Sequence, residues 1–132
     1  MQRRFESLNT QAKLLSISDL IKTNPVFFKS FYSSPIAKAI VLHNTGKYIE
    51  VNNQFLKLFE CTRKQVIGKS PDELGLWANQ EERKDILKKF KKNKKKSYNF
   101  DVRSLKGNIK NVIVSSEIIK VNGTEYLLGN LQ

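Results

Sequence analysis

The sequence has 132 residues, the length of a single domain, which is enough to bury a hydrophobic core without disulfide or metal staples. Its single cysteine, Cys61, and single histidine, His43, exclude an internal disulfide and a histidine–cysteine metal cluster. The formal net charge of +12 attracts polyanions such as nucleic acid or anionic lipid, but it says nothing about the fold. No apolar run approaches the about 20 residues of a membrane span, and the first residues lack the core of a signal peptide, so we expect a cytoplasmic domain.

The first 21 residues are predicted to be helical. Their apolar residues recur at the three- and four-residue spacing of a heptad seam, which would form a dimer contact through Phe5, Leu8, Ala12 and Leu15. Two heptads fit a helix lying on its own domain equally well, so both interpretations stay open. Pro25 interrupts the helix. We therefore divide the chain into an N-terminal amphipathic helix with its linker, residues 1–24, and a globular domain, residues 25–132.

A short apolar segment, residues 26–35, is either helical or irregular. After it, the spacing of apolar residues changes from a helical to a strand pattern. β-branched residues predict a strand over 36–43 and a hairpin over 36–51, with Gly46 supplying the positive φ of the turn. Asn52 is placed to cap the helix that follows. Two short helices come next. The first is closed by Gly68, and the second has Ser70 as its cap and a proline at its first position.

The strongest helix signal covers residues 79–94 and ends in a lysine run. Asn79 caps this helix, acidic residues fill its first turn, and seven lysines lie between residues 88 and 96. Each cation near a helix C-terminus gains about 0.3–1 kcal/mol from the helix dipole. Aromatic side chains interleaved for base stacking are lacking, so we interpret the run as a solvated helix end and expect no specific nucleic-acid partner. A basic polyanion-binding module remains the less favoured alternative.

Three strands complete the predicted domain. Tyr98, Phe100 and Val102 alternate with polar residues, a turn containing Gly107 follows, and a long strand over 109–121 leads into an Asn-Gly hairpin and a last strand. The element order predicts an α+β domain. Its five-stranded antiparallel sheet would carry short helices and one long helix on one face, in addition to the N-terminal amphipathic helix.

No arrangement of residues argues for catalysis or for a metal. Gly68, Lys69 and Ser70 lack the preceding glycine of a phosphate-binding loop. Arg63 and Lys64 would lower the pKa of the Cys61 thiol, but a small residue at a helix end is the favoured interpretation. We therefore do not expect this chain to be an enzyme.

The element order and several motifs resemble the PAS (sensory-box) domain family over residues 26–131. The motifs are Ser34-Pro35, Thr45-Gly46, Val51-Asn52-Asn53-Gln54-Phe55 with Leu58, Gln65-Val66-Ile67-Gly68, Leu74-Gly75-Leu76-Trp77, Gly107 and Asn122-Gly123. In that family Asn52, Gly46, Gly68 and Gly107 would be structural motif residues. The family's closing Asp-Ile-Thr would follow Gln132, so we expect a fragment of a larger signalling protein.

The resemblance implies a sensor or dimerisation module that regulates an output domain. The parent protein would be a histidine kinase or a cyclic-dinucleotide enzyme, since PAS domains often precede these. A small ligand would lie between the sheet and the helices. The candidates for its pocket wall are Phe55, Leu58, Phe59, Trp77, Ile86, Phe90, Val102, Val114 and Leu128. A packed core without a cavity stays open, and with it a ligand-free protein-interaction domain.

The resemblance also argues against two cofactors. In light-sensing flavin members the reactive cysteine occupies the position of Pro71, and Cys61 lies ten positions earlier, so flavin–cysteine photochemistry is not expected. Haem-binding members carry a histidine on the long helix, and residues 79–94 contain none. No cofactor is identified, and an unknown small ligand remains possible.

Overall fold

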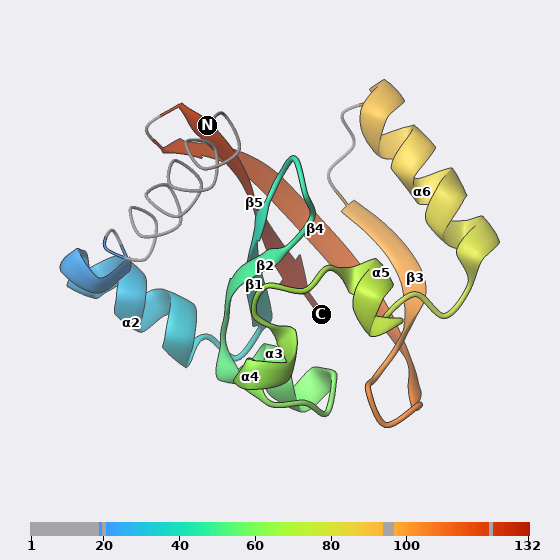
Figure 1. Cartoon of the computed structure of the whole chain (residues 1–132), viewed down its shortest axis with the longest axis horizontal. Coiled ribbons are helices and arrows are strands. Elements are labelled where there is room, and N and C mark those ends of the chain that lie inside the picture. Colours follow the sequence, from blue (N-terminus) through green and yellow to red (C-terminus); the bar gives the residue numbers. More distant parts are fainter. Residues whose placement is uncertain (1–18, 20, 94–96, 122) are drawn as a thin grey trace, which may run out of the picture.

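The computed structural model describes residues 19, 21–93, 97–121 and 123–132. The predicted dimer seam at Phe5, Leu8, Ala12 and Leu15 lies outside the described residues. All the strands of the described residues belong to one sheet, and helices pack on both of its faces (Figure 1).

The sheet has five antiparallel strands in the order β2-β1-β5-β4-β3. Their bounds are β1 Ala37–Leu42, β2 Tyr48–Val51, β3 Ser97–Arg103, β4 Ile109–Val121 and β5 Thr124–Leu131. The last strand therefore lies at the centre, against the first. The predicted five-stranded antiparallel sheet is confirmed, and β4 has the predicted bounds.

The helices begin where the sequence provides caps. Their bounds are α2 Pro25–Ser33, α3 Asn53–Leu58, α4 Arg63–Val66, α5 Pro71–Leu74 and α6 Gln80–Asn93. Asn52 accepts a hydrogen bond from the backbone nitrogen of Phe55, and Asn79 accepts from those of Glu81 and Glu82. The predicted capping role of Asn52 is thus confirmed, and the segment at 26–35, which was either helical or irregular in sequence, is mostly helix.

Two hydrophobic clusters form, one on each face of the sheet. The inner cluster lies between the sheet and α3 to α6, with Phe55, Phe59 and Val66 essentially inaccessible to solvent. The outer cluster joins Phe27 and Phe31 of α2 to Ile40 and Tyr126 of the sheet. Figure 1 shows α2 on one side of the sheet and α3 to α6 on the other. The predicted short helices and long helix share one face, while α2 covers part of the opposite one.

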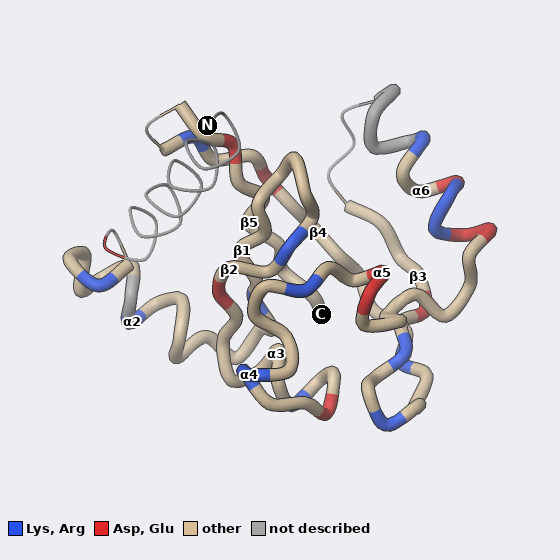
Figure 2. Tube along the Cα trace, in the orientation of Figure 1, with Lys and Arg blue, Asp and Glu red and all other residues tan. Residues whose placement is uncertain are grey.

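Basic residues are spread over several elements. Exposed lysines lie on α2 at Lys29, in the β1–β2 turn at Lys47, on α4 at Lys64 and in the β3–β4 turn at Lys106. Figure 2 shows this scatter of basic positions along the described chain. On α6, Lys84 and Lys88 are exposed; the side chains of residues 89–96 lie outside the described set. The described positive charge is therefore not confined to one face.

Candidate functional site

Seven of the nine predicted pocket residues meet in the inner cluster. They are Phe55, Leu58, Phe59, Trp77, Ile86, Val102 and Val114. The rings of Phe55 and Phe59 are 4.6 Å apart, and Trp77 stacks on Phe100 with ring centroids 4.8 Å apart. Such aromatic pairs stabilise a core beyond the area that they bury. The predicted residues thus form one continuous apolar layer between the sheet and the helices.

One predicted residue, Leu128, lies on the opposite face of the sheet. Leu128 packs in the outer cluster because its register partner is Ile40, which faces α2. The inner positions of β5 include Gly129 and Leu131, which pair with Ala39 and Ala37. The side chain of Phe90 lies outside the described set. The predicted pocket wall also lacked several inner-cluster members on the strands, including Tyr48, Phe100, Val112 and Leu131.

Two grooves open at the edge of the inner cluster. The first, of about 480 Å³, runs between α3, the start of α4 and the β3–β4 turn; it is lined by Leu56, Lys57, Glu60, Cys61, Thr62, Gln65, Leu105 and Lys106. The second, of about 460 Å³, lies between α3 and the adjoining ends of β1 and β5; it is lined by Pro35, Ile36, Ala37, Gln54, Lys57, Leu58, Leu131 and Gln132. Lys57 lines both, so one cation lies next to two largely apolar hollows.

Glu60 fixes the rim of the first groove. It adopts a left-handed backbone conformation with φ of 52°, which costs about 1–2 kcal/mol for a residue with a Cβ atom. Its carboxylate accepts hydrogen bonds from Asn108 at 2.5 Å and Ser104 at 2.9 Å, and these bonds hold its pKa below the ordinary value. Lys110 lies 3.7 Å away. Glu60 therefore ties the end of α3 to the β3–β4 turn.

Cys61, in the same groove, is not an activated thiol. It is half-buried, and burial raises its pKa above the ordinary value. The neighbouring Arg63 is turned toward Glu50 instead. This favours the interpretation of Cys61 as a small structural residue. Within the described residues, no three His, Cys, Asp or Glu side chains form a group that could hold a metal ion.

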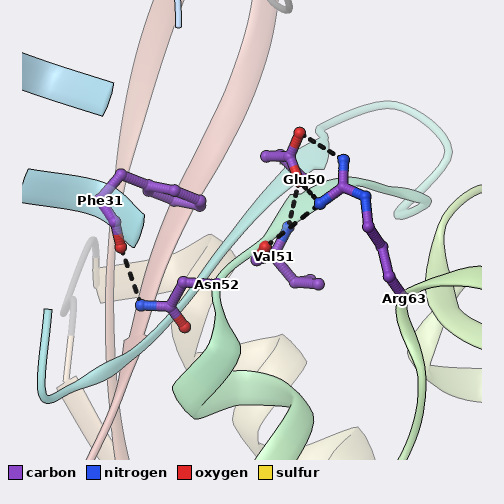
Figure 3. A network of polar contacts seen from close by, with 5 residues as sticks. All are labelled: Phe31, Glu50, Val51, Asn52 and Arg63. Atoms are coloured by element: carbon purple, nitrogen blue, oxygen red, sulfur yellow. Dashed lines mark hydrogen bonds and ion pairs between the residues drawn. The ribbon is translucent and has the colours of Figure 1, made fainter. Parts of the chain in front are cut away.

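Asn52 follows the C-terminal end of β2 and joins three segments of the chain (Figure 3). Its amide nitrogen donates to the carbonyl oxygens of Phe31 and Ile36, both at 2.9 Å. Its side-chain oxygen accepts from the backbone nitrogens of Lys38 at 2.9 Å and Phe55 at 3.0 Å. The residue is completely buried, and its amide makes these four bonds at once. Asn52 therefore fixes the end of α2, the entry to β1 and the start of α3 together.

Glu50 forms a second polar junction beside it (Figure 3). Its carboxylate accepts two hydrogen bonds from the guanidinium of Arg63, one of them 2.6 Å between Nη2 and Oε2. The backbone nitrogen of Val51 also donates to Oε1 at 3.1 Å. Glu50 is only 6% exposed. A bidentate arginine pair is the arrangement that best compensates a carboxylate removed from water.

With the fold and these junctions established, the chain can be compared with known proteins. The sequence model of the PAS domain family matches residues 37–131. The chain belongs to the PAS domain family. This confirms the resemblance, and α2 precedes the matched region. Membership identifies the chain as a sensory signalling module rather than a catalytic domain.

Solved structures share the fold at low sequence identity. The PAS domain of an HTR-like protein from Haloarcula marismortui is 19% identical with a TM-score of 0.62, covering 100% of this chain and 98% of that one. A PAS domain from a two-component sensor histidine kinase is 14% identical with a TM-score of 0.56, covering 96% and 97%. A LOV protein from Rhodobacter sphaeroides is 18% identical with a TM-score of 0.63, covering 77% of this chain and 61% of that protein. These identities establish the fold alone.

No curated protein matches the sequence at a significant level. Among the described helices, none is both long and apolar enough to cross a membrane.

Proposed function

We propose that this PAS domain is a cytoplasmic sensor module that binds a small ligand, forms a homodimer or does both, and so regulates an output domain of a larger signalling protein. The parent would be a histidine kinase or a cyclic-dinucleotide enzyme. The observation that supports ligand binding is that the inner cluster continues into the walls of the two grooves. Leu56, Leu58 and Leu131 pack on that cluster and also line a groove.

The walls of the grooves suggest the chemistry of the ligand. Both combine leucine side chains with Lys57, whose ammonium group is the cation common to the two. A small, mainly apolar molecule with an acidic group would bury its body against the leucines and place its charge near this lysine. Ligand sites commonly combine apolar walls with a few well-placed polar groups.

Native mass spectrometry of the purified chain, next to its denatured mass, tests the ligand. We expect an additional mass after incubation with cell extract, lost on denaturation. Leu56→Trp and Leu58→Trp would each fill one groove, and at least one should remove that mass. Leu87→Trp is the matched control, because Leu87 on α6 is 40% exposed and lines neither groove. A chain that never carries extra mass would favour the ligand-free interaction domain.

The same spectra test the proposed dimer seam. Leu8→Asp places a charge in the heptad pattern and should convert an even multiple of the chain mass into a monomer. Ser7→Asp adds the same charge next to the seam and should leave the assembly intact. An unchanged mass in Leu8→Asp would contradict a seam through Phe5, Leu8, Ala12 and Leu15.

A further inference from the structure

Glu50 lies where elements from the two faces of the sheet approach each other. It belongs to β2, an edge strand, and pairs across the sheet with Ile40, a member of the outer cluster. Arg63, its ion-pair partner, is the first residue of α4, whose Val66 is buried in the inner cluster. The guanidinium therefore reaches around the sheet edge from the inner helices to the outer side.

The outer helix contributes a third member of this junction. Tyr32 of α2 packs against the outer cluster, and its hydroxyl is hydrogen-bonded with Glu50 and Arg63. Burial, followed by the hydrogen bond to the Glu50 carboxylate, raises the pKa of Tyr32 well above its ordinary value. The hydroxyl thus keeps its proton and serves as donor to the carboxylate. Glu50 is held from α2 on one side and from α4 on the other.

We propose that Glu50 couples the position of α4 to the docking of α2, so that movement of Arg63 on the inner side loosens α2 on the outer side. The carboxylate is almost fully buried, so it needs its cation. When Arg63 moves away, Glu50 is better stabilised by turning toward water, and Tyr32 then loses its acceptor. The polar contact that holds α2 near β2 is removed by an event on the other face.

The place where such a movement would start is the first groove. Thr62 and Gln65 line it, and Arg63 lies between them at the beginning of α4. The side chain of Gln65 accepts a hydrogen bond from the backbone nitrogen of Thr62 at 2.9 Å, which fixes this helix start. Occupation of the groove would displace these residues and Arg63 with them. This last step rests on the proposed sensor function, whereas the coupling between α4 and α2 does not.

Two contacts ensure that α2 is loosened and not unfolded with the domain. Asn52 still donates to the carbonyl oxygen of Phe31, and Phe31 remains packed on Ile40 and Tyr126. Neither contact involves Glu50 or Arg63. The structure thus separates a permanent attachment at the end of α2 from a conditional one at Tyr32.

Hydrogen exchange followed by mass spectrometry tests the coupling without any ligand. In Arg63→Gln, the amides of α2 at residues 26–33 should exchange at least about tenfold faster than in the wild type, because local opening sets their protection. Amides of β4 and β5 should keep their protection. Arg83→Gln is the matched control: Arg83 makes a bidentate pair with Asp72, at 2.6 and 2.5 Å, away from α2. Equal α2 exchange in both variants would overturn the coupling.

A second pair of variants identifies Glu50 as the link. In Glu50→Gln, which removes the charge but keeps the shape, adding Arg63→Gln should cause no further loss of α2 protection. Additive losses would overturn the role of Glu50. If Arg63→Gln also exposes β4 and β5, Tyr32→Phe decides, since it removes only the hydroxyl. Faster α2 exchange with an intact sheet supports the coupling, and unchanged α2 exchange refutes it. The search for a bound mass is separate, so failure of the sensor function leaves this result standing.

Discussion

The two faces of the sheet are covered in different ways. On the inner face, Phe55 and Phe59 are 0% and 1% exposed, and the consecutive helices α3 to α6 pack over the strands. On the outer face, α2 covers the side of β1 and β5, while Ile109 and Ile113 of β4 remain 52% and 46% exposed. The inner face is closed by apolar packing. The outer face combines a smaller apolar contact with polar links, which suits a helix whose attachment can change.

The largest effect should come from the inner face. Phe55→Ala removes a fully buried ring that contacts Tyr48 and Phe59, with centroids 5.1 and 4.6 Å apart. We expect the free energy of unfolding to fall by about 3–5 kcal/mol, because the surrounding residues cannot close the cavity. Urea denaturation measures it. Val26→Ala, at a position 79% exposed, is the control and should change the free energy by less than about 0.5 kcal/mol.

Asn52→Ala should have the next largest effect and should reach both faces. It removes four hydrogen bonds and leaves buried backbone groups of Phe31, Lys38 and Phe55 without partners. The expected loss is about 2–4 kcal/mol, since each unsatisfied buried group costs about 1–3 kcal/mol and some regain water. Hydrogen exchange should increase in both α2 and α3. Asn53→Ala, at the exposed neighbouring position, should leave both unchanged; a loss confined to α3 would contradict the joining role.

The contrast between the faces also explains which features were predictable from sequence. The spacing of apolar residues and the capping side chains determine local structure, so β4, β5 and the cap at Asn52 were predicted correctly. Residue 128 was placed on the wrong face because Leu127 and Leu128 are adjacent and equally apolar. Only the pairing of β5 with β1, across almost ninety residues of chain, places Leu128 beside Ile40 on the face that α2 covers.

Polar junctions were beyond the reach of sequence reasoning for a similar reason. Glu50 and Arg63 lie on a strand and a helix thirteen positions apart, and no short-range spacing rule links them. Their contact depends on how α4 packs against the edge of β2. Glu60 likewise carries no short-range signal in the sequence that points to its contacts. Its contacts with Ser104 and Asn108 depend on the β3–β4 turn returning to the end of α3.

A smaller effect is expected where β1 ends and β5 begins. The Nδ1 atom of His43 lies 2.8 Å from Oε2 of Glu125, and this hydrogen bond lowers the pKa of Glu125 below its ordinary value of 4.5. Because the folded-state pKa is depressed, the carboxylate contributes stability above pH 4.5, and that stability is lost as the pH falls through the folded pKa.

His43→Ala should move the pKa of Glu125 back toward its ordinary value, which NMR titration of the carboxyl carbon would measure. Lys120 lies 3.6 Å from the other carboxylate oxygen and also lowers the pKa of Glu125, so the return should be partial. His43→Gln is the control, because its amide can still donate to the carboxylate. An unchanged pKa of Glu125 in His43→Ala would mean that Lys120, not His43, governs it.

Two neighbouring residues test the comparison between the faces within a single strand. Val112 and Ile113 are neighbours on β4 and point to opposite faces, with exposures of 2% and 46%. Val112→Thr places a hydroxyl in the inner cluster and should lower the free energy of unfolding by about 1–3 kcal/mol. Ile113→Thr keeps a β-branched residue on the outer face, so its effect should stay within about 0.5 kcal/mol. Urea denaturation of both variants gives the comparison directly. If Ile113→Thr were as damaging as Val112→Thr, the outer half of the sheet would have to be covered in solution, and its apolar residues would belong to an interface and not to an open surface.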